Sequence, residues 1–198
     1  MLISIFMSFL IFADEYKNRT MTNTVAFGLP EAKVMAGKYV VTLIVAFIAF
    51  VVVEAVLVIS AYLLLGNTGW NNSADGMESL RQLLEADIAC IPLFMAGIAI
   101  YYALLFWMRN EMHAVWGWLA GVAGVGQVVG LLGMKFSFFQ KVEKILIYRL
   151  VGMYDYDEEN GLRLIWETAN GRIWCVMVGL VTTVIFLALA VIGSRKKR

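Results

Sequence analysis

The residues at Ile88–Met108, IACIPLFMAGIAIYYALLFWM, form 21 consecutive positions without a charged side chain. An α-helix rises about 1.5 Å per residue, so about 20 apolar residues are needed to cross the hydrocarbon core of a bilayer. This stretch is therefore long enough to span a membrane as one helix. Two further uncharged runs have the same length, Ala114–Met134 and Ile173–Gly193. A fourth run, Tyr39–Leu65, has 27 residues and a single charged side chain, Glu54.

The composition of the whole chain agrees with this interpretation. Of its 198 residues, 61% are hydrophobic and 16% are charged, whereas soluble domains average about 45–50% apolar and about 25% charged residues. We predict an all-α polytopic membrane protein in which residues 1–198 form a single transmembrane domain. The four runs are expected to be full transmembrane helices. Met1–Ala13, which is apolar for 13 residues, is expected to be a partial N-terminal span.

Lysine and arginine residues close to the spans predict the orientation, because cytoplasmic loops are enriched in them. The tail Ser194–Arg198 has four positive charges and no negative one, so we expect the C-terminus in the cytoplasm. Alternating spans then place Asp14–Lys38 and Arg109–His113 on the cytoplasmic side, and Gly66–Asp87 and Lys135–Arg172 outside. Gly66–Asp87 agrees with this placement, since it contains one basic and four acidic residues.

The longer outer loop contains a further apolar stretch, Lys141–Gly152 (KVEKILIYRLVG), which is too short to cross a membrane. We expect a re-entrant or interfacial helix there, followed by a solvated turn at the acidic Asp155–Glu159. In the shorter outer loop, Met77–Ala86 is expected to form a short amphipathic helix that leads into the next span. Tryptophans near span ends are typical membrane anchors, and we interpret three in this way: Trp116, Trp118 and Trp174.

Motifs for enzyme chemistry are absent from the sequence, which has no P-loop, GxSxG, HExxH or CxxC pattern. The single histidine is His113, and both cysteines, Cys90 and Cys175, lie inside apolar runs, so neither a metal site nor a disulfide framework is indicated. The formal net charge of +1 argues against a nucleic-acid-binding protein. We therefore expect no enzyme activity and no bound cofactor or metal in this chain.

The cytoplasmic connection Asp14–Lys38 is the most informative polar segment, because contact with lipid does not determine its length or its mixed polarity. Proline presets φ for the first turn of a helix, so Gly28-Leu29-Pro30 is expected to end one helix and begin the next. A helix–turn–helix just under the membrane would be a natural docking element for a soluble partner. A plain solvated loop is the alternative.

A spaced set of residues runs through this connection: Glu15, Tyr16, Lys17, Thr20, Leu29, Pro30, Lys33 and Lys38. Together with the order of the spans, this set resembles the permease (transmembrane) subunits of type-2 ABC exporters. Two positions depart from the family pattern, namely Arg19, where glycine is common, and Glu31, where a small hydroxyl residue is common. These permeases have six spans, a coupling helix between the second and third spans, and a re-entrant helical pair before the sixth. The resemblance implies that this chain lacks the N-terminal elbow helix and the first span.

The resemblance implies a subunit that exports a hydrophobic or amphipathic compound, such as a peptide, drug or lipid, across a bacterial plasma membrane. A separate cytoplasmic ABC ATPase subunit would hold ATP and Mg²⁺, and a second permease chain, identical or different, would complete the transporter. The residues implied at the ATPase-coupling interface are Glu15, Tyr16, Lys17, Thr20, Gly28, Leu29, Pro30 and Lys33.

Two polar residues within the apolar runs are candidates for a translocation path. Glu54 lies near the middle of its run, where an acidic side chain costs about 2.5–3.5 kcal/mol on insertion scales. It is expected to face protein or water, either as a wall of the path or as a buried acid bonded to a neighbouring helix. Gln127, in the middle of its span, can form hydrogen bonds across helices.

Glycines at a spacing of four residues are frequent in Ala114–Met134. Small residues at this spacing allow helices to approach closely, and here they are Gly117 and Gly121, and Gly126 and Gly130. We expect packing within the bundle, with a dimer interface as the alternative. The alternative function is a non-transporting immunity or sensory protein of the membrane that binds a peptide through Lys135–Arg172.

Overall fold

The computed structural model describes residues 31–69, 73–108, 110–157 and 161–195. The predicted partial span Met1–Ala13, and the cytoplasmic connection up to Pro30, lie outside these residues. Four helices are long and apolar enough to cross a membrane, and they are Lys33–Ala61, Arg81–Met108, Glu111–Gly133 and Ala169–Gly193. The prediction of four full spans is confirmed by the length and composition of these helices, which indicate a multi-pass membrane protein.

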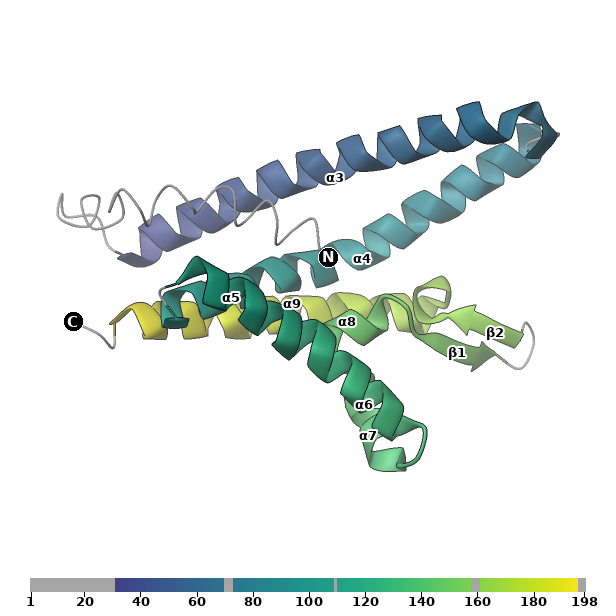
Figure 1. The fold of residues 1–198 in the computed structure, drawn as a ribbon. Helices are drawn as coiled ribbons and strands as arrows, with labels where there is room; N and C mark the ends of the chain where they lie inside the picture. The colour runs from purple at the N-terminus through teal and green to yellow at the C-terminus, as the bar shows by residue number, and fades with distance from the viewer. Residues whose placement is uncertain (1–30, 70–72, 109, 158–160, 196–198) are drawn as a thin grey trace.

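Helices α3 (Glu31–Gly69) and α4 (Ser73–Met108) form a long antiparallel hairpin (Figure 1). Both extend beyond the predicted spans, so the prediction of a loop over Gly66–Asp87 is largely wrong. The segment Met77–Ala86 is helical as predicted, and it is continuous with the span that follows. Leu, Glu, Gln and Arg are good helix formers, and extending an existing helix is far easier than nucleating a new one.

The third span is one continuous rod of three helical segments: α5 (Glu111–Trp118), the π-helical η1 (Leu119–Gly124) and α6 (Val125–Gly133). Asn110 caps the start of α5, where its side-chain oxygen accepts a hydrogen bond of 3.2 Å from the backbone N–H of His113. The cytoplasmic turn predicted over Arg109–His113 is therefore shorter than expected, because α5 already begins at Glu111.

The chain between the third and fourth spans is structured. Its elements are α7 (Ser137–Glu143), α8 (Ile147–Leu150), β1 (Tyr154–Asp157), β2 (Gly161–Leu164) and the 3₁₀ helix η2 (Ile165–Glu167). In place of one helix over Lys141–Gly152, the structure has two short helices with a break between them. The start of the predicted turn Asp155–Glu159 belongs to an antiparallel hairpin in which Asp155 is opposite Arg163.

Helix α9 (Ala169–Arg195) runs parallel to α4 and packs against it along their shared length (Figure 1). The two helices are in contact at three levels, where the partners are 86 or 87 residues apart in the sequence: Glu85 with Arg172, Pro92 with Gly179, and Trp107 with Gly193. A Cβ atom added at Gly179 would lie 2.5 Å from the carbonyl carbon of Pro92. Only glycine therefore allows the backbones to come this close.

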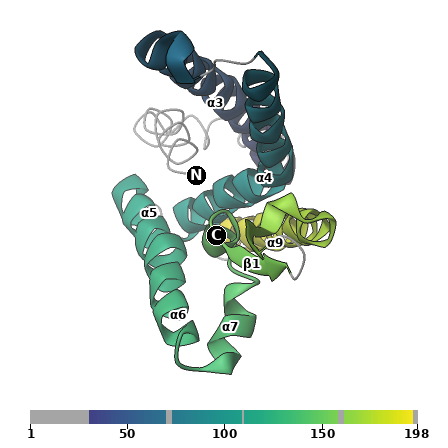
Figure 2. The ribbon, with the colours of Figure 1, turned by 90° about the vertical axis from the view of Figure 1, so that its right-hand side faces the viewer.

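Helix α4 is the centre of the structure. Of its candidate span, 67% is buried, compared with 11% of the span in α3. Figure 2 shows α3 on one side of α4 and α9, and α5 and α6 on the other. The fully buried large side chains of α4 are Leu93, Ile98, Tyr101, Tyr102 and Leu105.

Tryptophans near the span ends have two different environments. Trp116 and Trp174 are 66% and 44% exposed, as expected for membrane anchors. Trp118 is fully buried, and its indole N–H donates a hydrogen bond of 2.8 Å to the backbone oxygen of Gly97 in α4. The interpretation of Trp118 as a membrane anchor is wrong, because this side chain joins the third span to the core.

Candidate functional site

The residues of the predicted coupling interface lie almost entirely outside the described part of the chain. This applies to Glu15, Tyr16, Lys17, Thr20, Gly28, Leu29 and Pro30. Lys33 is described, and it lies near the beginning of α3 with its side chain exposed. Lys33 is also the first residue of the candidate span Lys33–Ala61, so the helix is continuous from Lys33 through that span.

Glu54 on α3 has an acidic neighbour on α4. Its carboxyl group lies close enough to the side chain of Asp87 for the two groups to interact electrostatically. Asp87 is the last charged residue before the uncharged part of α4, and Glu54 lies toward the end of the candidate span Lys33–Ala61. Glu54 is thus paired with a polar group, and it lies nearer to the end of the span than its place in the apolar run indicates.

A cluster of buried hydroxyl groups joins α3 to α4 and α9. The Thr42 and Tyr102 hydroxyls are 2.7 Å apart, and both residues are fully buried. The Tyr39 hydroxyl donates to the backbone oxygen of Met95 at 2.9 Å. The side chain of Thr183 on α9 lies near the Tyr39 hydroxyl and donates its own hydrogen bond of 2.8 Å to the backbone oxygen of Gly179. Because no water is available in the bilayer core, such polar groups have to find partners in neighbouring helices.

The second candidate for the translocation path is not close to the first. Gln127 is exposed on α6, and α6 lies on the opposite side of α4 and α9 from α3 (Figures 1 and 2). The structure of one chain therefore does not bring Glu54 and Gln127 together. A path that both residues line would need a second chain or another conformation.

The four predicted packing glycines have different surroundings. Gly126 and Gly130 are buried, and Cβ atoms added to them would lie 3.0 Å from Tyr148 Cδ1 and 2.8 Å from Arg149 Cζ. Gly117 faces the end of α4, where the added atom would lie 3.0 Å from Met108 Cε. A Cβ atom added at Gly121 would meet no atom of a neighbouring element within 4 Å in the described residues. Close packing within this part of the chain therefore does not require glycine at this position.

The buried glycine face of α6 holds an ion pair of the outer loop. Arg149 on α8 pairs with Glu143 at the end of α7, and the Glu143 side chain is only 10% exposed. Glu143 lies against Gly133, where an added Cβ would be 3.1 Å from its Oε2 atom. The ion pair joins α8 to the end of α7, and both of its side chains lie against glycines of α6.

The break between α7 and α8 also has a specific partner. The indole N–H of Trp174 on α9 donates a hydrogen bond of 2.7 Å to the backbone oxygen of Lys144. This bond satisfies a carbonyl group at the point where the helical ladder ends, a group that would otherwise lack a partner. The α7–α8 unit is therefore bound to the third span by the ion pair and to the fourth span by Trp174.

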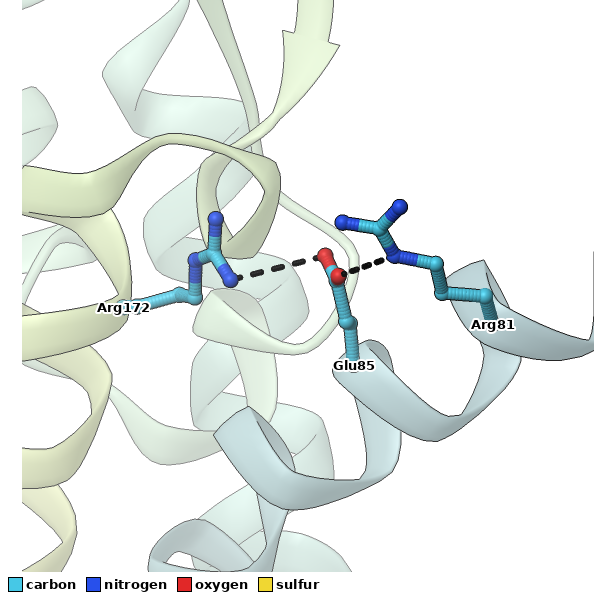
Figure 3. Close-up of polar contacts among 3 residues, drawn as sticks. All are labelled: Arg81, Glu85 and Arg172. Carbon is cyan, nitrogen blue, oxygen red and sulfur yellow. Dashed lines mark hydrogen bonds and ion pairs between the residues drawn. The ribbon is translucent and has the colours of Figure 1, made fainter. Parts of the chain in front are cut away.

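A charged contact joins α4 and α9 near Glu85 and Arg172. Glu85 lies between two arginines, accepting from Arg81 Nε at 3.1 Å and from Arg172 Nη1 at 3.5 Å (Figure 3). Arg81 and Glu85 are one turn apart on α4, whereas Arg172 belongs to α9. These side chains are 40–70% exposed, so the contact is a surface contact, and such pairs contribute about 0–1 kcal/mol.

Within the described residues, no group of three or more His, Cys, Asp or Glu side chains could hold a metal ion. No protein-family model, no curated protein and no solved structure matches the chain.

Three polar contacts were missed by the sequence analysis, and each had a detectable signal. Asp87 directly precedes the uncharged run in α4, Tyr39 and Thr42 lie in the first four residues of the run in α3, and Arg149 interrupts an apolar stretch. A polar group at such a position needs a partner. The sequence identifies the need, but only the structure identifies the partners.

Proposed function

We propose that this chain is the membrane-spanning permease subunit of an ABC exporter. ATP and Mg²⁺ would bind to a separate cytoplasmic ATPase subunit, and a second permease chain would complete the transporter. The C-terminus would be cytoplasmic, and the cargo would be a hydrophobic or amphipathic peptide, drug or lipid moved across the plasma membrane.

One observation carries the proposal: two short helices, α7 and α8, which are too short to cross a membrane, lie between the last two candidate spans. This arrangement is the one expected for the re-entrant pair before the last span of such permeases. The motif of Asp14–Lys38 supports the same proposal from the other end of the chain. In addition, α3 runs without interruption from Glu31 through the span, so it can carry a movement from that segment into the membrane.

The test replaces Leu29 and Pro30 together by alanine in the full chain, with Thr22→Ala plus Asn23→Ala as a matched control in the same segment. The chain is purified from native membranes, and the vanadate-sensitive ATPase activity that co-purifies with it is measured. We expect activity with the unmodified chain and with the control, and loss of most of it with the Leu29–Pro30 variant. A well-folded, unmodified chain that purifies without ATPase activity would contradict the proposal.

Glu54 is proposed to act in the path as an acceptor for positively charged or amphipathic cargo. Glu54→Gln keeps a group that can hydrogen-bond to Asp87 but removes the negative charge. We expect a severalfold loss of export of a cationic amphipathic dye, with the abundance of the protein unchanged. Equal export by both proteins would leave Glu54 with a packing role only.

The hairpin of β1 and β2 favours the alternative, a sensory or immunity protein that binds a peptide on its outer side. A two-stranded sheet has free edges to which an extended peptide can add. The same purification distinguishes the two functions. An exporter subunit should purify with ATPase activity, whereas a sensory or immunity protein should be stable and active without an ATPase.

A further inference from the structure

An apolar and basic surface lies where the third span ends. We call the segment Met134–Ile145 the interfacial tip; it follows directly after Gly133, the last residue of the candidate span Glu111–Gly133. Met134, Phe136, Phe138 and Ile145 in this tip are 51–84% exposed. Figure 2 shows α6 and α7 side by side at the end farthest from α3.

The interfacial tip has an excess of positive charge. Lys135, Lys141 and Lys144 are all exposed, and Glu143 is the single acidic residue of the segment. Because Glu143 is buried and paired with Arg149, it does not neutralise these lysines. None of the three lysines forms an ion pair with a residue that the structure describes.

Two features place the interfacial tip at the surface of the bilayer. It begins where the span Glu111–Gly133 ends, and Lys144 accepts a hydrogen bond from Trp174, in the second turn of α9. Both candidate spans therefore meet the same membrane face at this level. Exposed aromatic rings flanked by lysines are typical of the region where acyl chains meet the headgroups.

We propose that the interfacial tip binds anionic phospholipid headgroups. The lysines contact the phosphate groups, and Phe136 and Phe138 lie among the upper parts of the acyl chains. Anionic lipid is the occupant that the charge selects, because each basic residue near an anionic surface increases binding roughly fivefold. A protein partner for this apolar surface would instead be expected to bring carboxylates to the lysines.

The test places a photoreactive benzoylphenylalanine at Phe138 in the full chain. The chain is reconstituted in vesicles of equal amounts of phosphatidylcholine and phosphatidylglycerol, and lipid adducts of the peptide that contains position 138 are identified by mass spectrometry. We expect the phosphatidylglycerol adduct to exceed the phosphatidylcholine adduct at least fivefold. High salt should reduce this excess, because it screens the lysines.

Two triple variants decide whether the lysines are responsible. Substitution of Lys135, Lys141 and Lys144 by glutamine should bring the adduct ratio close to that of the vesicles, whereas substitution of all three by arginine should retain the excess. The same ratio in the glutamine and arginine variants would overturn the proposal. Equal amounts of both adducts in the unmodified chain would overturn it as well, and so would a protein adduct in place of lipid in native membranes.

Discussion

Helix α4 packs against both α9 and α3, and the two contacts differ in kind. The contact with α9 is continuous, and at Gly179 and Gly193 there is no room for a Cβ atom without displacement of Pro92 or Trp107. The contact with α3 is discontinuous, with polar contacts at Tyr39, Thr42 and Glu54 and a ring contact between Phe50 and Phe94. Between and beyond these points, most side chains of α3 are exposed.

This difference indicates which helix can move. Close packing of the α4 and α9 backbones fixes the register and the distance between the two helices, since tightly packed protein interiors have low compressibility. Segments with few buried contacts open and shift more easily. Because α3 also continues directly from the predicted coupling segment, we expect α4 and α9 to remain fixed relative to each other while α3 changes its position.

The largest effect is expected where the α4–α9 contact is closest. Gly179→Ala should lower the free energy of unfolding by about 1–3 kcal/mol, because the added methyl group overlaps the backbone of Pro92. Gly121→Ala is the matched control, since nothing lies within 4 Å of its added Cβ, and alanine is favoured over glycine in a helix by about 1 kcal/mol. Unfolding in detergent micelles, followed by circular dichroism, measures both. Equal stabilities would show that α4 and α9 are not in close contact.

A smaller effect is expected at the α3–α4 contact. A double-mutant cycle of Thr42→Val and Tyr102→Phe should give a coupling energy of about 0.6 kcal/mol, with an upper limit of about 1.7 kcal/mol, as found for hydrogen bonds between membrane helices. The same unfolding measurement applies to the two single variants and the double variant. Additive effects of the two substitutions would mean that these hydroxyls do not interact.

The smallest effect is expected at the outer charged contact. Arg172→Gln removes the pairing of α9 with Glu85 and should cost at most about 1 kcal/mol, because the side chains are exposed. Arg81→Gln is the comparison variant, since its ion pair with Glu85 lies within α4. The cost of Arg172→Gln should decrease in high salt. A loss of several kcal/mol would give this contact a larger part in holding α4 and α9 together than the packing at Gly179.

The membrane spans could be predicted from the sequence because they depend on a local property, the length of an uncharged run. Ile88–Met108 and Ile173–Gly193 both lie within helices of the structure. The extensions of these helices were harder to predict. Met77–Ala86 was predicted as a separate helix, but nothing in its polarity shows that it is continuous with α4.

The partners of polar residues could not be predicted, because they belong to other helices. Glu54 was expected to need a partner, but the sequence does not show that the partner is Asp87. The division of Lys141–Gly152 into two helices has the same origin, since Trp174 stabilises the break from 30 residues away. Trp118 was assigned to lipid because its position near a span end resembles that of an anchor, and the direction of its ring depends on how α5 packs on α4.

Distances between spin labels, measured by double electron–electron resonance, test whether α3 moves relative to a fixed α4–α9 pair. In a chain with Cys90→Ala and Cys175→Ala, labels at Ile88 and Ile192 report on α4 and α9, and labels at Ile59 and Ile192 report on α3 and α9; all three sites are exposed. We predict a narrow distance distribution for Ile88–Ile192 and a distinctly broader one for Ile59–Ile192 in lipid vesicles. Two distributions of equal width would contradict the account.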